Sequence, residues 1–171
     1  MWFSFQQPSN RFMFERVECE MFNYVANHSC YAKMVARDTI SVDFFITPSQ
    51  PMRNLKLHSV FYYRFNPHTY SKFLVDHWED LCGYLSGRKS SPLLDVAFKL
   101  FGSHSNMNHS CPYNESIKVV FKDYELKKFI IEPLLPAGRF RLDNFYYGGG
   151  PEKLIASVKV YFAISDHRIW H

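Results

Sequence analysis

The chain has 171 residues, of which 47% are hydrophobic and 21% charged, a composition typical of one folded domain rather than of a disordered segment. Its net charge of +4 comes from 20 basic and 16 acidic side chains. The basic residues are scattered, so the sequence offers no compact patch for nucleic acid. No run of about 18 apolar residues occurs, and we expect no membrane span. The aromatic fraction of 18% favours β-strands with large apolar contact areas.

Strand patterns dominate the first half of the chain. Residues 13–22 form a mixed strand candidate, and the polar residues that follow, ending with 27–29, predict that the next strand begins at Cys30. Polar and apolar residues alternate over 39–46, and this strand should stop at Thr47-Pro48. Residues 54–65 place Leu55, Leu57, Phe61, Tyr63 and Phe65 on one face, and residues 70–77 do the same for Phe73 and Val75.

The period becomes helical in the middle of the chain. Residues 78–87 have Trp78, Leu81, Cys82 and Leu85 at helical spacing, and the spacing recurs between Leu93 and Phe101. Ser91 fits an N-cap, Pro92 fits the first helical position and Gly102 fits the stop. Two short helices are therefore predicted.

Strand patterns return after a polar loop at 103–116. We expect strands at 117–122, 128–132, 138–147 and 153–165. In the third of these, Phe140, Leu142 and Tyr146 share one side, and Arg139, Arg141 and Asp143 share the other. The sequence thus predicts an all-β fold, an antiparallel immunoglobulin-like β-sandwich of seven to eight strands with a two-helix insertion at about 78–102. This domain spans 13–165, between tails at 1–12 and 166–171.

The cysteines and glycosylation sequons indicate an extracellular protein. Cys19, Cys30, Cys82 and Cys111 form an even set without a C-x-x-C pair, which favours two disulfides over a zinc site. N-glycosylation sequons start at Asn27, Asn108 and Asn114. The first 15 residues have no readable signal peptide. Either export is absent or these residues replace a missing first segment.

Three segments together resemble a large insect family of uncharacterised secreted domains. They are NHSCPY at 108–113, FLVDHWEDLC at 73–82 and LLPAGRF at 134–140, and the resemblance covers about residues 13–165. That family is related to the myeloid-differentiation-2-related lipid-recognition (ML) fold, in which an apolar ligand lies between two splayed sheets. The resemblance implies that Cys82 pairs with Cys111, and with the even cysteine count it predicts that Cys19 pairs with Cys30.

The expected function is non-enzymatic binding. The sequence has no G-x-S-x-G, H-E-x-x-H or phosphate-binding glycine loop, and we expect no catalytic residues, cofactor or metal. The predicted partners are a lipid or other small apolar molecule and a cell-surface receptor, in a chemosensory or immune role. A cystine-stabilised interaction module with a filled core is the alternative, because a close-packed sandwich shows the same alternation. The predicted ligand-binding residues are Phe44, Leu57, Phe61, Phe73, Phe98, Phe140, Leu142, Val158, Val160 and Phe162.

Overall fold

The computed structural model describes residues 11–36, 39–122, 135–149 and 153–165. Within these ranges the elements are β1 (Arg11–Met21), β2 (Val25–Ala36), β3 (Thr39–Pro48), β4 (Lys56–Asn66), β5 (Thr69–Asp80), α1 (Leu81–Leu85), α2 (Pro92–Phe101), the 3₁₀ turn η1 (Gly102–His104), β6 (Ile117–Lys122), β7 (Gly138–Gly148) and β8 (Lys153–Ser165). The chain is mostly antiparallel strand with two short α-helices, and the predicted all-β sandwich is confirmed.

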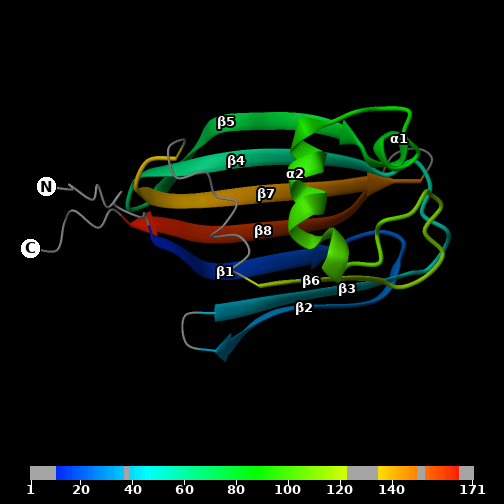
Figure 1. Ribbon diagram of the computed structural model, residues 1–171, viewed down its shortest axis with the longest axis horizontal. Coiled ribbons are helices and arrows are strands. Elements are labelled where there is room, and N and C mark those ends of the chain that lie inside the picture. The colour runs from blue at the N-terminus through cyan, green and yellow to red at the C-terminus, as the bar shows by residue number, and fades with distance from the viewer. Residues whose placement is uncertain (1–10, 37–38, 123–134, 150–152, 166–171) are drawn as a thin grey trace, which may run out of the picture.

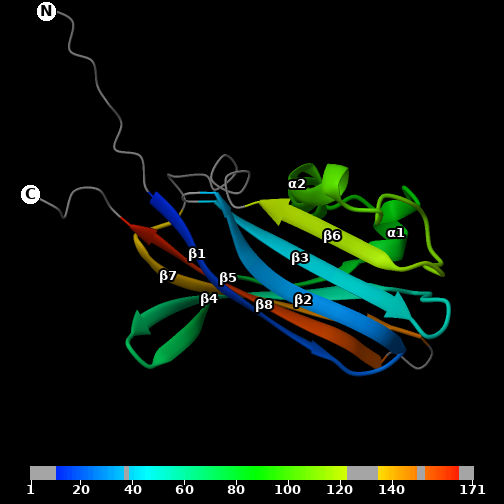
Figure 2. The same ribbon diagram turned by 90° about the horizontal axis from the view of Figure 1, so that it is seen from below.

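The sandwich has two sheets of unequal size. The larger has the strand order β1-β8-β7-β4-β5, and the smaller has the order β2-β3-β6. Figure 1 shows α2 crossing in front of β4, β7 and β8, and Figure 2 shows that α2 lies in the layer of β6. α2 therefore covers the middle of one face of the five-stranded sheet, and the smaller sheet lies alongside β1 and packs on the same side. No other described element covers its opposite, outer face.

Local capping explains where the helices begin. Ser91 is the N-cap of α2, its Oγ accepts a hydrogen bond from the Leu94 N–H at 3.1 Å, and Pro92 and Gly102 stand where the sequence predicts them. The prediction that a helix starts at Trp78 is wrong. Asp80 caps α1 by accepting a hydrogen bond from the Gly83 N–H, so the helix begins only at Leu81.

The first or last residues of several strands also differ from the predicted ones. β2 begins at Val25 rather than at Cys30, because the polar residues 27–29 pair with β3 in a strand that is exposed over most of its length. β3 includes Thr47 and Pro48, where we expected it to stop. Phe12, which we placed in the N-terminal tail, lies in β1 and is buried. The predicted strand 128–132 lies outside the described residues.

Phe65 does not join the buried face predicted for 54–65. Its side chain is 63% exposed, because it lies near the tip of the β4–β5 hairpin, beyond the point where β7 stops pairing with β4 at Tyr63. Tyr63 itself packs closely on the start of β7. Gly138 has a φ of 151°, and a Cβ at that position would lie 2.5 Å from the Tyr63 ring. Glycine is therefore required where this ring crosses the backbone.

Candidate ligand site between the sheets

The inner face of the five-stranded sheet carries two separate apolar clusters. The first includes Leu57, Leu94, Tyr113 and Ala156 and lies beside the helices. The second is mainly aromatic and centres on Phe140, which is fully buried and stacks on Phe61 and Phe162 with ring centroids 5.4 Å apart in both pairs. Large aromatic contacts of this kind stabilise a sandwich core strongly.

A single row of residues separates the two clusters. The strand register places Cys19, Val158, Asn144 and Ser59 side by side across β1, β8, β7 and β4, and we call these four residues the central row. Two residues away along each strand, in one direction, the side chains belong to or pack on the first cluster; they are Met21, Ala156, Tyr146 and Leu57. Two residues away in the other direction, the side chains belong to or pack on the second cluster; they are Val17, Val160, Leu142 and Phe61. The side chains of the central row therefore point between the sheets.

The polar residues of the central row are joined to each other. The Ser59 hydroxyl donates a hydrogen bond of 2.7 Å to Oδ1 of Asn144, and Ser59 is only 3% exposed. Neither residue was among our predicted ligand-binding positions. The signal was present in the sequence, since Ser59 and Asn144 occupy inward phases in strands whose other inward residues are apolar. The register that makes them neighbours could not be predicted from that pattern.

The ten predicted ligand-binding residues divide between the clusters. Leu57, Phe44 and Phe98 belong to or pack on the first cluster, and Phe61, Phe73, Phe140, Leu142, Val160 and Phe162 belong to or pack on the second. Val158 lies between them in the central row. The structure thus brings all ten to the interior, but as two groups with a polar pair between them rather than as one continuous wall.

Four inward side chains on β1, β7 and β8 are less well covered than the residues at either end of the interior. Val17, Leu142, Val158 and Val160 point between the sheets, yet all four are only half-buried. In contrast, Phe140, one row beyond Leu142, and Ala156, one row beyond Val158 toward the other end, are fully buried. Protein atoms therefore cover these four side chains less completely than the centres of the two clusters.

Both disulfides connect separate parts of the fold. Cys19–Cys30 links β1 of the large sheet to β2 of the small sheet, and Cys82–Cys111 links α1 to the loop before β6. Both predicted pairings are confirmed. Cys19 lies in the central row, so the first disulfide joins the two sheets in the same row as the Ser59–Asn144 pair, with Val158 between them. Disulfides of this kind fit an extracellular domain.

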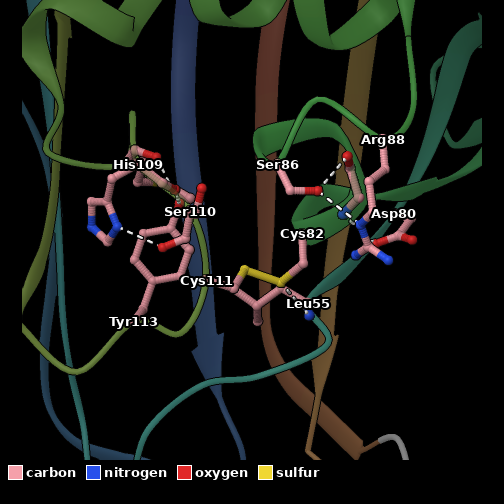
Figure 3. The surroundings of a disulfide bond; sticks show 11 residues. Leu55, Asp80, Cys82, Ser86, Arg88, His109, Ser110, Cys111 and Tyr113 are labelled. Carbon is pink, nitrogen blue, oxygen red and sulfur yellow. Dashed lines mark hydrogen bonds between the residues drawn. A yellow bond between two sulfur atoms is a disulfide. The ribbon is translucent and has the colours of Figure 1, made fainter.

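The second disulfide is surrounded by the NHSCPY segment on one side and by α1 on the other (Figure 3). The Leu55 N–H donates a hydrogen bond to Sγ of Cys82 at 3.2 Å. Tyr113 is completely buried, and its hydroxyl donates to the carbonyl oxygens of Met107 at 2.6 Å and His109 at 3.1 Å. Burial, with a smaller contribution from Glu115, raises the pKa of Tyr113 to about 12. This tyrosine therefore holds the loop that carries the disulfide.

The outer face of the large sheet carries charges that neutralise each other. Nε and Nη2 of Arg141 donate to the two carboxylate oxygens of Asp143 at 2.7 and 2.9 Å. The Arg141 guanidinium also lies 4.3 Å from the ring centre of Tyr62 and 5.2 Å from that of Tyr70. Asp143 is 2% exposed. These residues lie opposite Phe140, as predicted, but they form a packed assembly rather than a solvated surface.

The predicted glycosylation acceptors and one surface depression lie outside the interior. The acceptors Asn27, Asn108 and Asn114 are all exposed. A shallow polar depression lined by Ser103, His104, Ser105, Asn106, Lys118 and Val120 lies on the outer side of β6, away from the interior. Among the described residues, no helix is long and apolar enough to cross a membrane.

The fold and its two disulfides define a cystine-stabilised β-sandwich domain. Residues 57–142, half of the chain, match a family described as "Protein of unknown function (DUF1091)", and the chain belongs to that family. The matched segment begins in β4 and ends in β7, so it contains both helices, Ser59 and the Cys82–Cys111 disulfide. The match agrees with the predicted membership of an uncharacterised family. A search of curated proteins finds no match.

Proposed function

We propose that this protein is a secreted, non-enzymatic carrier that holds a lipid or other small apolar molecule between its two sheets, in the manner of the lipid-recognition (ML) fold. The observation that carries the proposal is the half-buried state of Val17, Leu142, Val158 and Val160, which are apolar and point inward. Apolar side chains that face inward and yet keep accessible surface are suited to line a lipid site. An extracellular setting is supported by the two disulfides and by the three exposed sequons.

The expected affinity follows from buried area. Covering about 400 Å² of apolar surface contributes roughly 10 kcal/mol at 25 cal/mol per Å². Association costs offset part of this gain. A dissociation constant in the micromolar range, which corresponds to about 8 kcal/mol, is then reasonable.

A filling substitution tests the site. Val158→Phe places a larger apolar group in the central row, and Val96→Phe makes the same change on α2, where Val96 is 44% exposed. We expect Val158→Phe to block displacement of a fluorescent fatty-alcohol or sterol probe while the unfolding free energy changes little. Val96→Phe should bind as the unchanged protein does. Native mass spectrometry of protein with both disulfides intact supplies an independent measure of bound lipid.

The opposite result would favour a filled core. If the unchanged protein binds no apolar probe and Val158→Phe lowers the unfolding free energy by the roughly 1–3 kcal/mol typical of overpacking, the carrier proposal fails.

A cystine-stabilised protein-interaction module is the second candidate. It is supported by exposed apolar side chains on the β4–β5 hairpin, where Leu74 is 73%, Phe65 63% and Trp78 50% exposed. Exposed apolar groups of this size are common at protein contact sites. Leu74→Ser with Phe65→Ser should abolish binding to a cell-surface receptor under this alternative, and should leave lipid binding unchanged under the carrier proposal.

A further inference from the structure

The Ser59–Asn144 pair is polar, whereas the side chains around it on the inner face are apolar. In each of the four strands that form the central row, the residues two positions away on either side belong to or pack on an apolar cluster. A polar side chain at such a position costs free energy unless its hydrogen-bonding groups find partners. The question is therefore which of those groups are satisfied within the protein.

The amide of Asn144 is only partly satisfied. Its Oδ1 accepts the Ser59 hydroxyl at 2.7 Å, but Nδ2, with two N–H donors, makes no hydrogen bond to any described residue. Within the described part of the chain, the one fully buried side-chain nitrogen or oxygen without a hydrogen bond is His109 Nε2. Nδ2 of Asn144 therefore retains accessible surface. Since the side chain points between the sheets, its donors are available to a molecule held there.

The charge of the interior limits what that molecule can be. The ionisable residues nearest the pair in the strand register are His77, the β5 partner of Ser59, and Glu79, the partner of Leu57, and His77 Nε2 lies 3.3 Å from the Glu79 carboxylate. The nearest charged pair on β7, Arg141 with Asp143, points to the outer face and is already neutralised. An anionic headgroup beside Asn144 would meet only this histidine, which already faces the Glu79 carboxylate, and a buried charge without its own partner is costly.

We infer that Asn144 is a specificity-determining residue that donates a hydrogen bond to an oxygen of a neutral lipid, and that the ligand class is an uncharged long-chain alcohol, ester, ketone or sterol. This inference rests on the proposed carrier function. Ser59 holds the amide by its oxygen and so directs Nδ2 toward the ligand. The half-buried apolar side chains of Val17, Leu142, Val158 and Val160 contact the hydrocarbon beside the oxygen.

Two substitutions that break the same hydrogen bond separate recognition from structure. Asn144→Leu removes the donors and keeps a similar volume, whereas Ser59→Ala removes the hydroxyl and leaves the donors in place. A double variant with both changes removes the polar pair without leaving either partner unsatisfied, which keeps the fold testable if Asn144→Leu alone does not fold. Displacement of a fluorescent probe is measured with a straight-chain alkane, alcohol and carboxylic acid of equal length at pH 8.

The unchanged protein should bind the alcohol about three- to tenfold more tightly than the alkane, which is the usual net contribution of one hydrogen bond, and more tightly than the ionised acid. Asn144→Leu and the double variant should lose the preference for alcohol over alkane, and Ser59→Ala should keep part of it, because the Nδ2 donors remain although the hydroxyl no longer directs them. Equal loss in Asn144→Leu and Ser59→Ala would show a structural role and overturn the inference. Equal binding of alkane and alcohol by the unchanged protein would also overturn it and leave the carrier function intact. Binding of none of the three refutes the carrier function itself.

Discussion

The Cys82–Cys111 disulfide should contribute more to stability than Cys19–Cys30. The two bonds close loops with sequence separations of 29 and 11 residues. In the chain-entropy treatment, these separations correspond to roughly 3.6 and 2.8 kcal/mol at 25 °C. Cys82 is also only 7% exposed, and its sulfur accepts the Leu55 N–H. Replacing it with alanine leaves that N–H without its acceptor and adds about 1 kcal/mol.

We therefore expect Cys82→Ala/Cys111→Ala to lower the unfolding free energy by about 4–5 kcal/mol, against about 3 kcal/mol for Cys19→Ala/Cys30→Ala. Urea unfolding followed by tryptophan fluorescence and by far-ultraviolet circular dichroism measures both values, and agreement of the two signals checks that unfolding is two-state. Removing the disulfide that closes the longer loop should therefore lower the unfolding free energy more. If the Cys19/Cys30 variant is the less stable of the two, the loop-length argument is refuted and the link between the two sheets is the more important restraint.

Two further predictions concern acid stability and glycosylation. A hydrogen bond from the Gly83 N–H and, secondarily, the Lys89 ammonium lower the pKa of Asp80, so its stabilising contribution is present above about pH 4 and is lost as the pH falls through the lowered pKa. Asp80→Asn should therefore be less stable than the unchanged protein by about 0.5–1 kcal/mol at pH 7, with the difference vanishing near pH 2; a difference independent of pH would contradict this. When the chain is expressed behind a signal peptide, Asn108 or Asn114 should carry a glycan that an N-glycan amidase removes with a mass shift, and secreted protein without any shift would refute the prediction.

The elements that could be predicted well are those with a single buried face or explicit caps. β8 and β7 show regular alternation because each has one face against the apolar clusters. α2 has its N-cap, proline and glycine where the sequence places them. The predicted start of β2 was wrong because most residues of this strand are exposed on both faces, so no alternation of polar and apolar residues marks where it begins. Trp78 fits a helical spacing with Leu81, yet it pairs with His58 in the sheet and stacks on its ring at 4.4 Å.

The sequence predicted which apolar residues face inward, but not that they form two clusters with a polar pair between them. The alternation places apolar residues inward, and in the structure the ten residues belong to or pack on the two clusters or lie in the central row. The alternation could not show that Ser59 of β4 and Asn144 of β7 lie side by side. Register depends on turns and on pairing between strands distant in sequence. Two isolated polar exceptions in the sequence thus become one adjacent pair in the fold.

The two polar pairs of β7 show why the inner one is the better candidate for recognition. On the outer face, Arg141 has both a bidentate carboxylate partner and two tyrosine rings, so its hydrogen-bonding and electrostatic needs are met within the protein. On the inner face, Asn144 keeps two donors that no described residue accepts. A group whose partners are complete stabilises the sheet and has little to offer a ligand. A group with unused donors, held by Ser59 in apolar surroundings, gains most when a ligand oxygen completes its hydrogen bonds.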